Sequence, residues 1–263
     1  MKKTITSALL LLVIFSLLSS CLKHDKEYLQ LGEVNLQMTE ELSDDSRSLH
    51  LNFFTVDEYD CLDNIIRYSS SSDPENIDII LIDVEKSDYC INNPGPAIGI
   101  IDLGSYGLGN YPVSIKVGDA ENTGSLKVTE ESYVIGFDDL QLLNIPYDTL
   151  YRIPENTIWG LARYFESEGE EKVDAFLDSL ENIGAIPLVL NQGDYGYFRA
   201  DSAGKIIVPE YLEFEYAKSF VYNYDGPMSD VESVISYFAD VYPQYLYVYL
   251  YNSKGQVFES NDY

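Results

Sequence analysis

Residues 111–117 read Tyr-Pro-Val-Ser-Ile-Lys-Val, in which every second side chain from Tyr111 onward is apolar. Leu49, Leu51 and Phe53 repeat the same period of two earlier in the chain. Because successive side chains of a strand point to opposite faces of its sheet, this alternation predicts strands with one face in a core. The run 118–124, rich in Gly, Asp and Asn, predicts the hairpin connection after the first of these segments.

Short strands of this kind fill residues 34–137, and no stretch of useful length in this region has helical spacing. The pattern predicts an immunoglobulin-like β-sandwich, with a five- or six-stranded barrel as the alternative fold. Residues 138–156 have little periodicity and carry Pro146 and Pro154, so we place a linker there. Residues 157–263 then form a second, smaller α+β domain.

Helical spacing appears only in this second domain. The first apolar stripe is Ile158, Leu161, Ala162 and Phe165, and the second is Val173, Phe176, Leu177 and Leu180. Both follow the i, i+3, i+4, i+7 pattern of a helix with one buried face, so together they predict a helical hairpin. A further helix begins near Ser229 and lies between predicted strands at 218–224 and 245–251, which predicts a βαβ unit if those strands are parallel.

The N-terminus carries a different signal. Met1-Lys2-Lys3 precedes a mostly apolar run over residues 5–18, and that run ends in Leu18-Ser19-Ser20-Cys21. This order of charge, apolar run and cysteine resembles the lipobox of bacterial lipoproteins. The resemblance implies that residues 1–20 are a signal peptide and that lipid is attached to Cys21. Acyl chains on Cys21 would hold the protein to a membrane without any spanning segment.

The same resemblance implies a location. Residues 21–33 are expected to be a lipidated tether, and the membrane is the expected partner through the anchor. Position 22 is Leu and not the Asp that marks inner-membrane retention in many lipoproteins, so the outer membrane is favoured. In composition the chain is similar to envelope lipoproteins of Bacteroidetes of unknown function. Periplasmic and surface-exposed orientations both remain open, and residues 22–263 resemble no characterised family.

Acidic residues dominate the charge. The formal net charge is −28, which repels nucleic acid, and nucleic acid is therefore not an expected partner. The carboxylates are scattered and match no EF-hand loop, so we expect no metal site and no cofactor. Apart from Cys21, the cysteines are Cys61 and Cys90. In an oxidising compartment these two are expected to form a disulfide, with two separate buried thiols as the alternative.

Tyrosines are the most unusual feature of the C-terminal strand. Tyr245, Tyr247, Tyr249 and Tyr251 alternate with Leu and Val and so share one face, which Tyr222 and Tyr224 of the neighbouring strand are predicted to join. One hypothesis is a flat aromatic platform that stacks sugar rings. The alternative is that the helical hairpin at 155–183 covers this face, which makes the tyrosines part of an ordinary core.

Catalytic motifs are absent from the sequence: it has no nucleophile elbow, zinc-binding His-Glu-x-x-His, P-loop or dinucleotide fingerprint, and no catalytic residue is predicted. His50 is the one histidine outside the predicted tether. We therefore expect a lipid-anchored binding protein of the cell envelope whose ligand is a glycan or another envelope protein. A hydrolase acting on polysaccharide and a structural component of a surface assembly are the alternatives.

Mass spectrometry of the protein isolated from its native envelope is expected to find Cys21 as the first residue, with a lipid joined to its sulfur through a thioether. An unmodified N-terminus downstream of residue 21, or the intact leader on cytosolic protein, would contradict the lipoprotein prediction.

Overall fold

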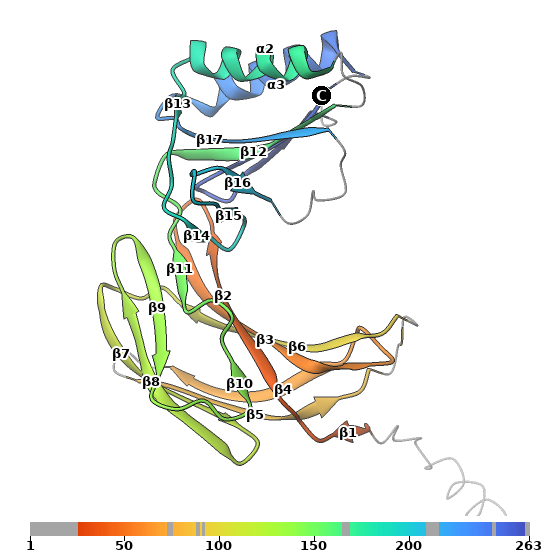
Figure 1. The fold of residues 1–263 in the computed structure, drawn as a ribbon, viewed down its shortest axis with the longest axis vertical. Helices are drawn as coiled ribbons and strands as arrows, with labels where there is room; N and C mark the ends of the chain where they lie inside the picture. The colour runs from red at the N-terminus through yellow and green to blue at the C-terminus, as the bar shows by residue number, and fades with distance from the viewer. Residues whose placement is uncertain are drawn as a thin grey trace, which may run out of the picture.

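The computed structural model describes residues 26–72, 76–87, 90, 93–164, 169–208, 216–243 and 246–260. They form two lobes, and Figure 1 shows both helices of the described residues on the outer side of the C-terminal lobe. The chain is mostly β-sheet with a small helical part, which confirms the β-rich class that the alternation predicts. Neither of these helices has the length and apolar character needed to cross a bilayer.

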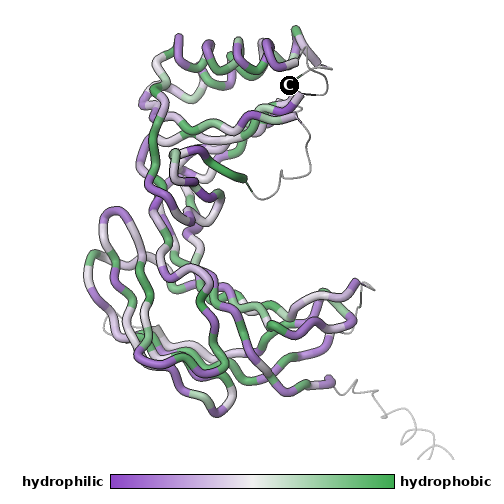
Figure 2. The backbone as a smooth tube through the Cα atoms, viewed as in Figure 1, coloured by the Kyte–Doolittle hydropathy of each residue, from purple (hydrophilic) through white to green (hydrophobic). Residues whose placement is uncertain are grey.

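One continuous sheet builds the N-terminal lobe. Its long strands are β2 (Val34–Leu42), β3 (Arg47–Tyr59), β4 (Ile65–Ser72), β5 (Ile77–Glu85), β6 (Gly95–Gly104), β7 (Gly109–Val117), β8 (Ala120–Val128) and β9 (Ser132–Phe137). Hydrogen-bonded neighbours follow the order β2-β3-β6-β4-β5-β7-β8-β9. Alternate side chains are buried, as Val113, Ile115 and Val117 are on β7, and Figure 2 shows hydrophilic and hydrophobic residues alternating along the chain.

Both ends of this strand order contribute to the same core. Leu36 on β2 and Ile135 on β9 belong to one buried apolar cluster, and the hydroxyl of Tyr133 on β9 reaches Glu40 on β2. The sheet therefore curves around its own core. Its closing strands come from residues 138–156, predicted as a linker, which contain β10 (Leu143–Asn144) beside β2 and β11 (Thr149–Tyr151) beside β9.

A segment from the second half of the chain extends this sheet. The short strands β14 (Gly193–Asp194), β15 (Arg199–Ala200) and β16 (Ile206–Ile207) follow β11 in the strand order. Figure 1 shows them between the two lobes, below the sheet of the C-terminal lobe. The two lobes are consequently joined by hydrogen-bonded strands as well as by the chain itself.

The described part of the predicted tether is packed on the N-terminal lobe. Strand β1 (Tyr28–Leu29) pairs with the end of β5, and Leu31 is buried in the core. Lys26 forms an ion pair with Glu85, and the guanidinium carbon of Arg67 lies 4.1 Å from the centre of the Tyr28 ring. Residues 26–31 thus belong to the folded body, and we refer to them as the N-terminal arm.

The disulfide prediction is confirmed, because the sulfurs of Cys61 and Cys90 lie at disulfide distance, with Cα atoms 5.3 Å apart. The bond ties the connection after β3 to the segment that precedes β6. The two cysteines are separated by 29 positions in sequence, and closing a loop of that size stabilises the fold by about 3 kcal/mol in the chain-entropy model.

A second sheet forms the C-terminal lobe, in the order β13-β17-β12-β18-β19. The bounds are β13 (Ile186–Pro187), β17 (Ala217–Asn223), β12 (Thr157–Tyr164), β18 (Leu246–Asn252) and β19 (Val257–Glu259). The helices α2 (Glu170–Asn182) and α3 (Met228–Val241) cover one face of this sheet, and the strands β14–β16 lie on the other side (Figure 1).

The helix predicted from Ile158, Leu161 and Ala162 is wrong, because these residues form the central strand β12. The first six residues of β12 are all buried, with Ile158 in the core under the helices and Trp159 in a cluster on the opposite face. A segment covered on both faces is apolar throughout, so its spacing also satisfies a helical pattern. At Gly160 a Cβ atom would lie 1.9 Å from the backbone oxygen of Tyr249, which only a glycine avoids.

The second predicted helix is confirmed as α2, with Val173, Phe176 and Leu180 buried. The predicted helical hairpin is wrong, because the described part of its first helix is strand β12 and α2 packs beside α3 instead. The βαβ prediction holds in a modified form. Strands β17 and β18 both run antiparallel to β12 and are therefore parallel to each other, with β12 between them. Helix α3 connects them across that intervening strand.

Gly124 and Gly136 provide a matched pair for testing the packing of β8 against β9. A Cβ at Gly124 would lie 2.0 Å from the Gly136 backbone oxygen, whereas a Cβ at Gly136 meets nothing within 4 Å. Gly124→Ala is expected to lower the free energy of unfolding in urea by about 1–3 kcal/mol, and Gly136→Ala to change it by less than about 0.5 kcal/mol. Equal effects of the two substitutions would contradict this strand packing.

Candidate functional site

The tyrosines of β18 lie on the face of the second sheet that the helices do not cover. Tyr247, Tyr249 and Tyr251 are half-buried, whereas the alternating Leu246, Val248 and Leu250 are buried against α2 and α3. For Tyr247, Tyr249 and Tyr251, the hypothesis that helices cover the tyrosines is therefore wrong. It depended on a helix at residues 158–165, whose described part is β12. Tyr245 lies outside the described residues.

Tyr222 and Tyr224 do not join this row. In the register of the sheet Tyr222 pairs with Ile158, and Tyr251 pairs with Trp159, one position further along β12. Because a shift of one residue moves a side chain to the other face of a sheet, Tyr222 points toward the helices. Both Tyr222 and Tyr224 are buried there. Burial and the nearby charge of Glu181 raise the pKa of Tyr222 to about 12.

Neighbouring side chains already occupy part of the tyrosine row. The ring of Tyr251 stacks on the buried Trp159 with centroids 5.8 Å apart, and the guanidinium carbon of Arg163 lies 5.0 Å from the centre of the Tyr247 ring. Trp159 also contacts Phe198 of the segment that carries β14–β16. The row is therefore part of the joint between the lobes at one end, and it is not a continuous flat platform.

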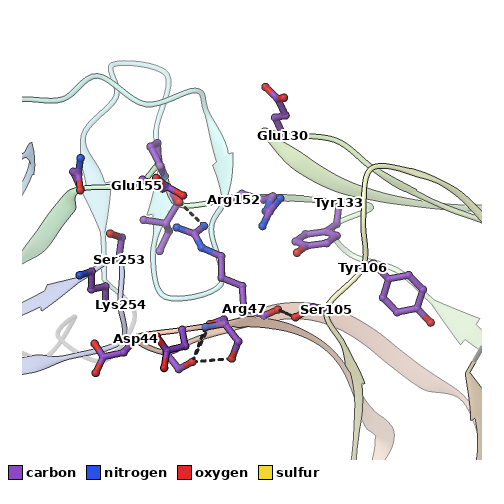
Figure 3. Close-up of a pocket in the computed structure, with 16 residues that line it drawn as sticks. Asp44, Arg47, Ser105, Tyr106, Glu130, Tyr133, Arg152, Glu155, Ser253 and Lys254 are labelled. Atoms are coloured by element: carbon purple, nitrogen blue, oxygen red, sulfur yellow. Dashed lines mark hydrogen bonds between the residues drawn. The ribbon is translucent and has the colours of Figure 1, made fainter. Parts of the chain in front are cut away.

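A larger opening lies where the two lobes meet. It has a volume of about 670 Å³ and is lined mostly by polar side chains. Its walls come from the turn after β2, from the segment that leads into β12 and from the turn between β18 and β19 (Figure 3). The lining residues are Ser43, Asp44, Asp45, Ser46, Arg47, Ser105, Tyr106, Glu130, Tyr133, Arg152, Ile153, Pro154, Glu155, Asn156, Ser253 and Lys254. We call this opening the interlobe cleft.

A buried carboxylate holds two of the cleft's arginines. Glu40 is only 3% exposed, and its Oε1 accepts hydrogen bonds from the Tyr133 hydroxyl at 2.8 Å and from Nε of Arg152 at 3.1 Å. Its Oε2 accepts one from Nη1 of Arg47 at 3.2 Å. The same Nη1 donates to the backbone oxygen of Ile153 at 2.7 Å. Two guanidinium groups thus share one carboxylate, so these three side chains together carry one net positive charge.

Tyr133 remains a hydrogen-bond donor in this cluster. Its ring is buried, and burial together with the charge of Glu40 raises the pKa of its hydroxyl far above the usual value. The guanidinium carbon of Arg152 lies 5.2 Å from the centre of the Tyr133 ring. Arg152 is therefore oriented by a carboxylate on one side and an aromatic ring on the other, a rigid arrangement that suits the recognition of a hydrogen-bonding ligand.

Sequence reasoning missed this cluster, although one signal for it is present. Along β2 the buried positions are Val34, Leu36, Met38, Glu40 and Leu42, so Glu40 occupies the apolar phase of a strand. A carboxylate in that phase must be paired, because an isolated buried charge is very unfavourable. Arg152 gives no comparable signal, since it follows a strand of only three residues, β11.

Comparison with known proteins adds no further assignment. No family model, curated protein or solved structure matches this chain. The described residues contain no group of three or more His, Cys, Asp or Glu side chains arranged to hold a metal ion. The predicted anchor Cys21 lies outside the described residues. The interlobe cleft is therefore the candidate site, on its geometry alone.

Glu40 is buried and its neighbour Glu41 is exposed, so substitutions at these two positions test how much the cluster stabilises the fold. Glu40→Gln removes the charge that the two arginines share, and we expect the free energy of unfolding in urea to fall by about 2–3 kcal/mol. Glu41→Gln is the control, because the Glu41 side chain is 66% exposed, and its effect is expected to stay within about 0.5 kcal/mol. If Glu40→Gln is as mild as Glu41→Gln, the cluster does not stabilise the closure of the curved sheet in the N-terminal lobe.

Proposed function

We propose that this protein is a lipid-anchored protein of the cell envelope. Lipid on Cys21 attaches it to the outer membrane. The leader and the Leu18-Ser19-Ser20-Cys21 sequence support this proposal. The arm adds a geometric argument. Lys26, where the described body begins, is five positions after Cys21, and five residue steps span at most roughly 17 Å. The N-terminal lobe would therefore lie close to the membrane surface.

The protein's role in this proposal is to bind a glycan in the interlobe cleft. The observation that carries it is the polar lining contributed by both lobes. Carboxylates such as Asp44 and Glu155 accept hydrogen bonds, and Arg47, Arg152 and Lys254 donate them, which is the mixture that sugar hydroxyls require. The cleft volume of about 670 Å³ is within the range of small-ligand sites.

The charge of the whole protein restricts the ligand. A body with a formal charge of −28 repels polyanions, so nucleic acid is not a partner in this proposal. A neutral or weakly charged sugar does not experience that repulsion.

The immunoglobulin-like sandwich predicted for the N-terminal lobe stays a prediction. A sandwich consists of two packed sheets, whereas the strands of this lobe form one continuous curved sheet.

A polysaccharide hydrolase is the second candidate, and one observation favours it. The cleft is lined by four carboxylates, Asp44, Asp45, Glu130 and Glu155, and glycoside hydrolysis needs two of suitable separation. Binding and hydrolysis are distinguished by the release of reducing ends when the protein is incubated with polysaccharides.

To test the proposal, full-length protein is applied to a glycan array, and the strongest ligand is titrated by calorimetry. The double variant Asp44→Asn, Lys254→Ala removes one group from each lobe, both exposed, and is expected to weaken binding by about tenfold or more. The matched control is Lys116→Ala, Asp119→Asn on the β7–β8 hairpin, where binding should be unchanged.

Absence of any glycan ligand, or unchanged affinity in the cleft variant, would contradict glycan binding in the cleft. Reducing ends released by the parent and lost in Glu130→Gln or Glu155→Gln would favour the hydrolase. Loss of the protein from the membrane fraction in Cys21→Ser tests the anchor separately from either activity.

A further inference from the structure

Helices α2 and α3 lie side by side on the outer face of the second sheet. The Phe176 ring meets the Phe238 ring at 5.6 Å, and Nζ of Lys172 lies 5.2 Å from the centre of the Tyr242 ring. Residues early in α2 therefore contact residues late in α3, so the two helices are antiparallel. Their inner stripes, which include Val173 and Ile235, are fully buried against the sheet.

An apolar groove remains on the outer side of this pair. It has a volume of about 340 Å³, and its floor consists of Ile183, Val234, Tyr237 and Phe238. Tyr237 is 57% exposed, and Val241, one turn further along α3, is 46% exposed. Val234, Tyr237 and Val241 follow the i, i+3, i+7 spacing of a helix face. Val234 packs at the edge of the core, and Tyr237 and Val241 extend the apolar surface of α3 outward from it.

Acidic residues predominate on the two helices that form the groove, and two of them, Glu170 and Asp174, are paired with Lys218 near the start of α2. The two helices together carry one basic residue, Lys172, and eight acidic residues: Glu170, Glu171, Asp174, Asp178, Glu181, Asp230, Glu232 and Asp240. Asp230 lines the groove itself. The C-terminal end of α2 reaches the groove at Ile183, and the last turn of α2 has no basic side chain. The partial negative charge of that helix end therefore adds to the negative potential.

An apolar floor with Asp230 beside it, between two helices rich in acidic residues, selects among possible occupants. A second copy of this chain carries the same acidic helices, and anionic lipid headgroups carry negative charge, so electrostatic repulsion opposes both. The complementary surface is a helix with an apolar stripe and Lys or Arg beside it, because helices dock in grooves through residues at i, i+3, i+4 and i+7.

We propose that the α2–α3 groove docks a basic amphipathic helix of a partner protein. The apolar stripe of that helix covers Val234, Tyr237 and Phe238, and its cations face Asp230 and the C-terminal end of α2. Figure 1 shows the helices at the end of the molecule opposite β1. The groove therefore points away from the anchor. This orientation rests on the proposed function, whereas the docking itself does not.

Three synthetic helical peptides of about 18 residues test the proposal by fluorescence anisotropy with full-length protein. The first has Leu on one face and Lys on the other, the second has Glu in place of Lys, and the third keeps Lys but has Ser in place of Leu. We expect only the first to bind, with an affinity that falls as salt is raised. Binding of the Lys and Ser peptide at equal strength would overturn the proposal, since charge alone would then explain it.

Single substitutions locate the binding surface. Tyr237→Lys places a cation on the groove floor and is expected to weaken binding of the first peptide by about tenfold or more. The matched control is Ile100→Lys on β6, since Ile100 is also exposed, at 54%, and belongs to the other lobe. Thermal unfolding of both variants verifies that they fold.

The proposal fails if Tyr237→Lys binds as the parent does, or if no peptide binds. It also fails if sedimentation shows self-association that Tyr237→Lys abolishes, because the occupant is then a second copy. Glycan binding by the cleft is measured independently in the same variants. The result for one proposal therefore does not decide the other.

Discussion

The closure of the curved sheet in the N-terminal lobe depends on the charge of Glu40. Its carboxylate is buried, and it accepts hydrogen bonds from groups on β3, on β9 and just after β11. Tyr133 and Arg152 are 93 and 112 positions from Glu40 in the sequence, so the cluster fixes the curved sheet at the place where its two ends meet. An unpaired carboxylate would be very unfavourable in this buried position. The register of β2 that pairs Glu40 with these groups is therefore strongly preferred over registers that would separate them.

Apolar contacts hold the two lobes together beside this cluster. Leu42 and Ile153 of the first lobe belong to one buried cluster with Trp159 of β12 and Phe198 of the β14–β15 connection. The backbone NH of Leu42 also donates to the hydroxyl of Tyr197 at 3.2 Å. The interlobe cleft is therefore framed by segments that hydrogen bonds and packing hold in place, and such a preorganised site loses little entropy when it binds a ligand.

Alternation in the sequence predicts the strands well wherever one face is exposed. It predicts β7 because Val113, Ile115 and Val117 point inward while Ser114 and Lys116 point outward. It fails for β12, because Ile158 and Trp159 are buried on opposite faces and the segment has no polar phase to reveal its period. Helix α2 is predicted because its outer side is charged and its inner side is not.

The candidate site was harder to predict than the fold. Its lining residues come from five separate parts of the chain. Only Glu40, which holds two of the lining arginines and occupies an apolar phase of β2, is marked in the sequence. The tyrosines of β18 are conspicuous, yet which of their neighbours share their face depends on the register of β17 against β12. Register is a property of long-range pairing, and spacing along one strand does not reveal it.

The N-terminal arm has a mechanical consequence. If lipid holds Cys21, any force that pulls the body away from the membrane enters through β1, which pairs with β5 at only two positions. That short pairing and its ion pairs are the weakest contacts that carry the force. Strand β1 would therefore separate from β5 before the long strands are strained. Release of Lys26 to Gln30 frees five residues, which is roughly 17 Å of chain. The lobe can then move away from the membrane under tension while its core and disulfide stay intact.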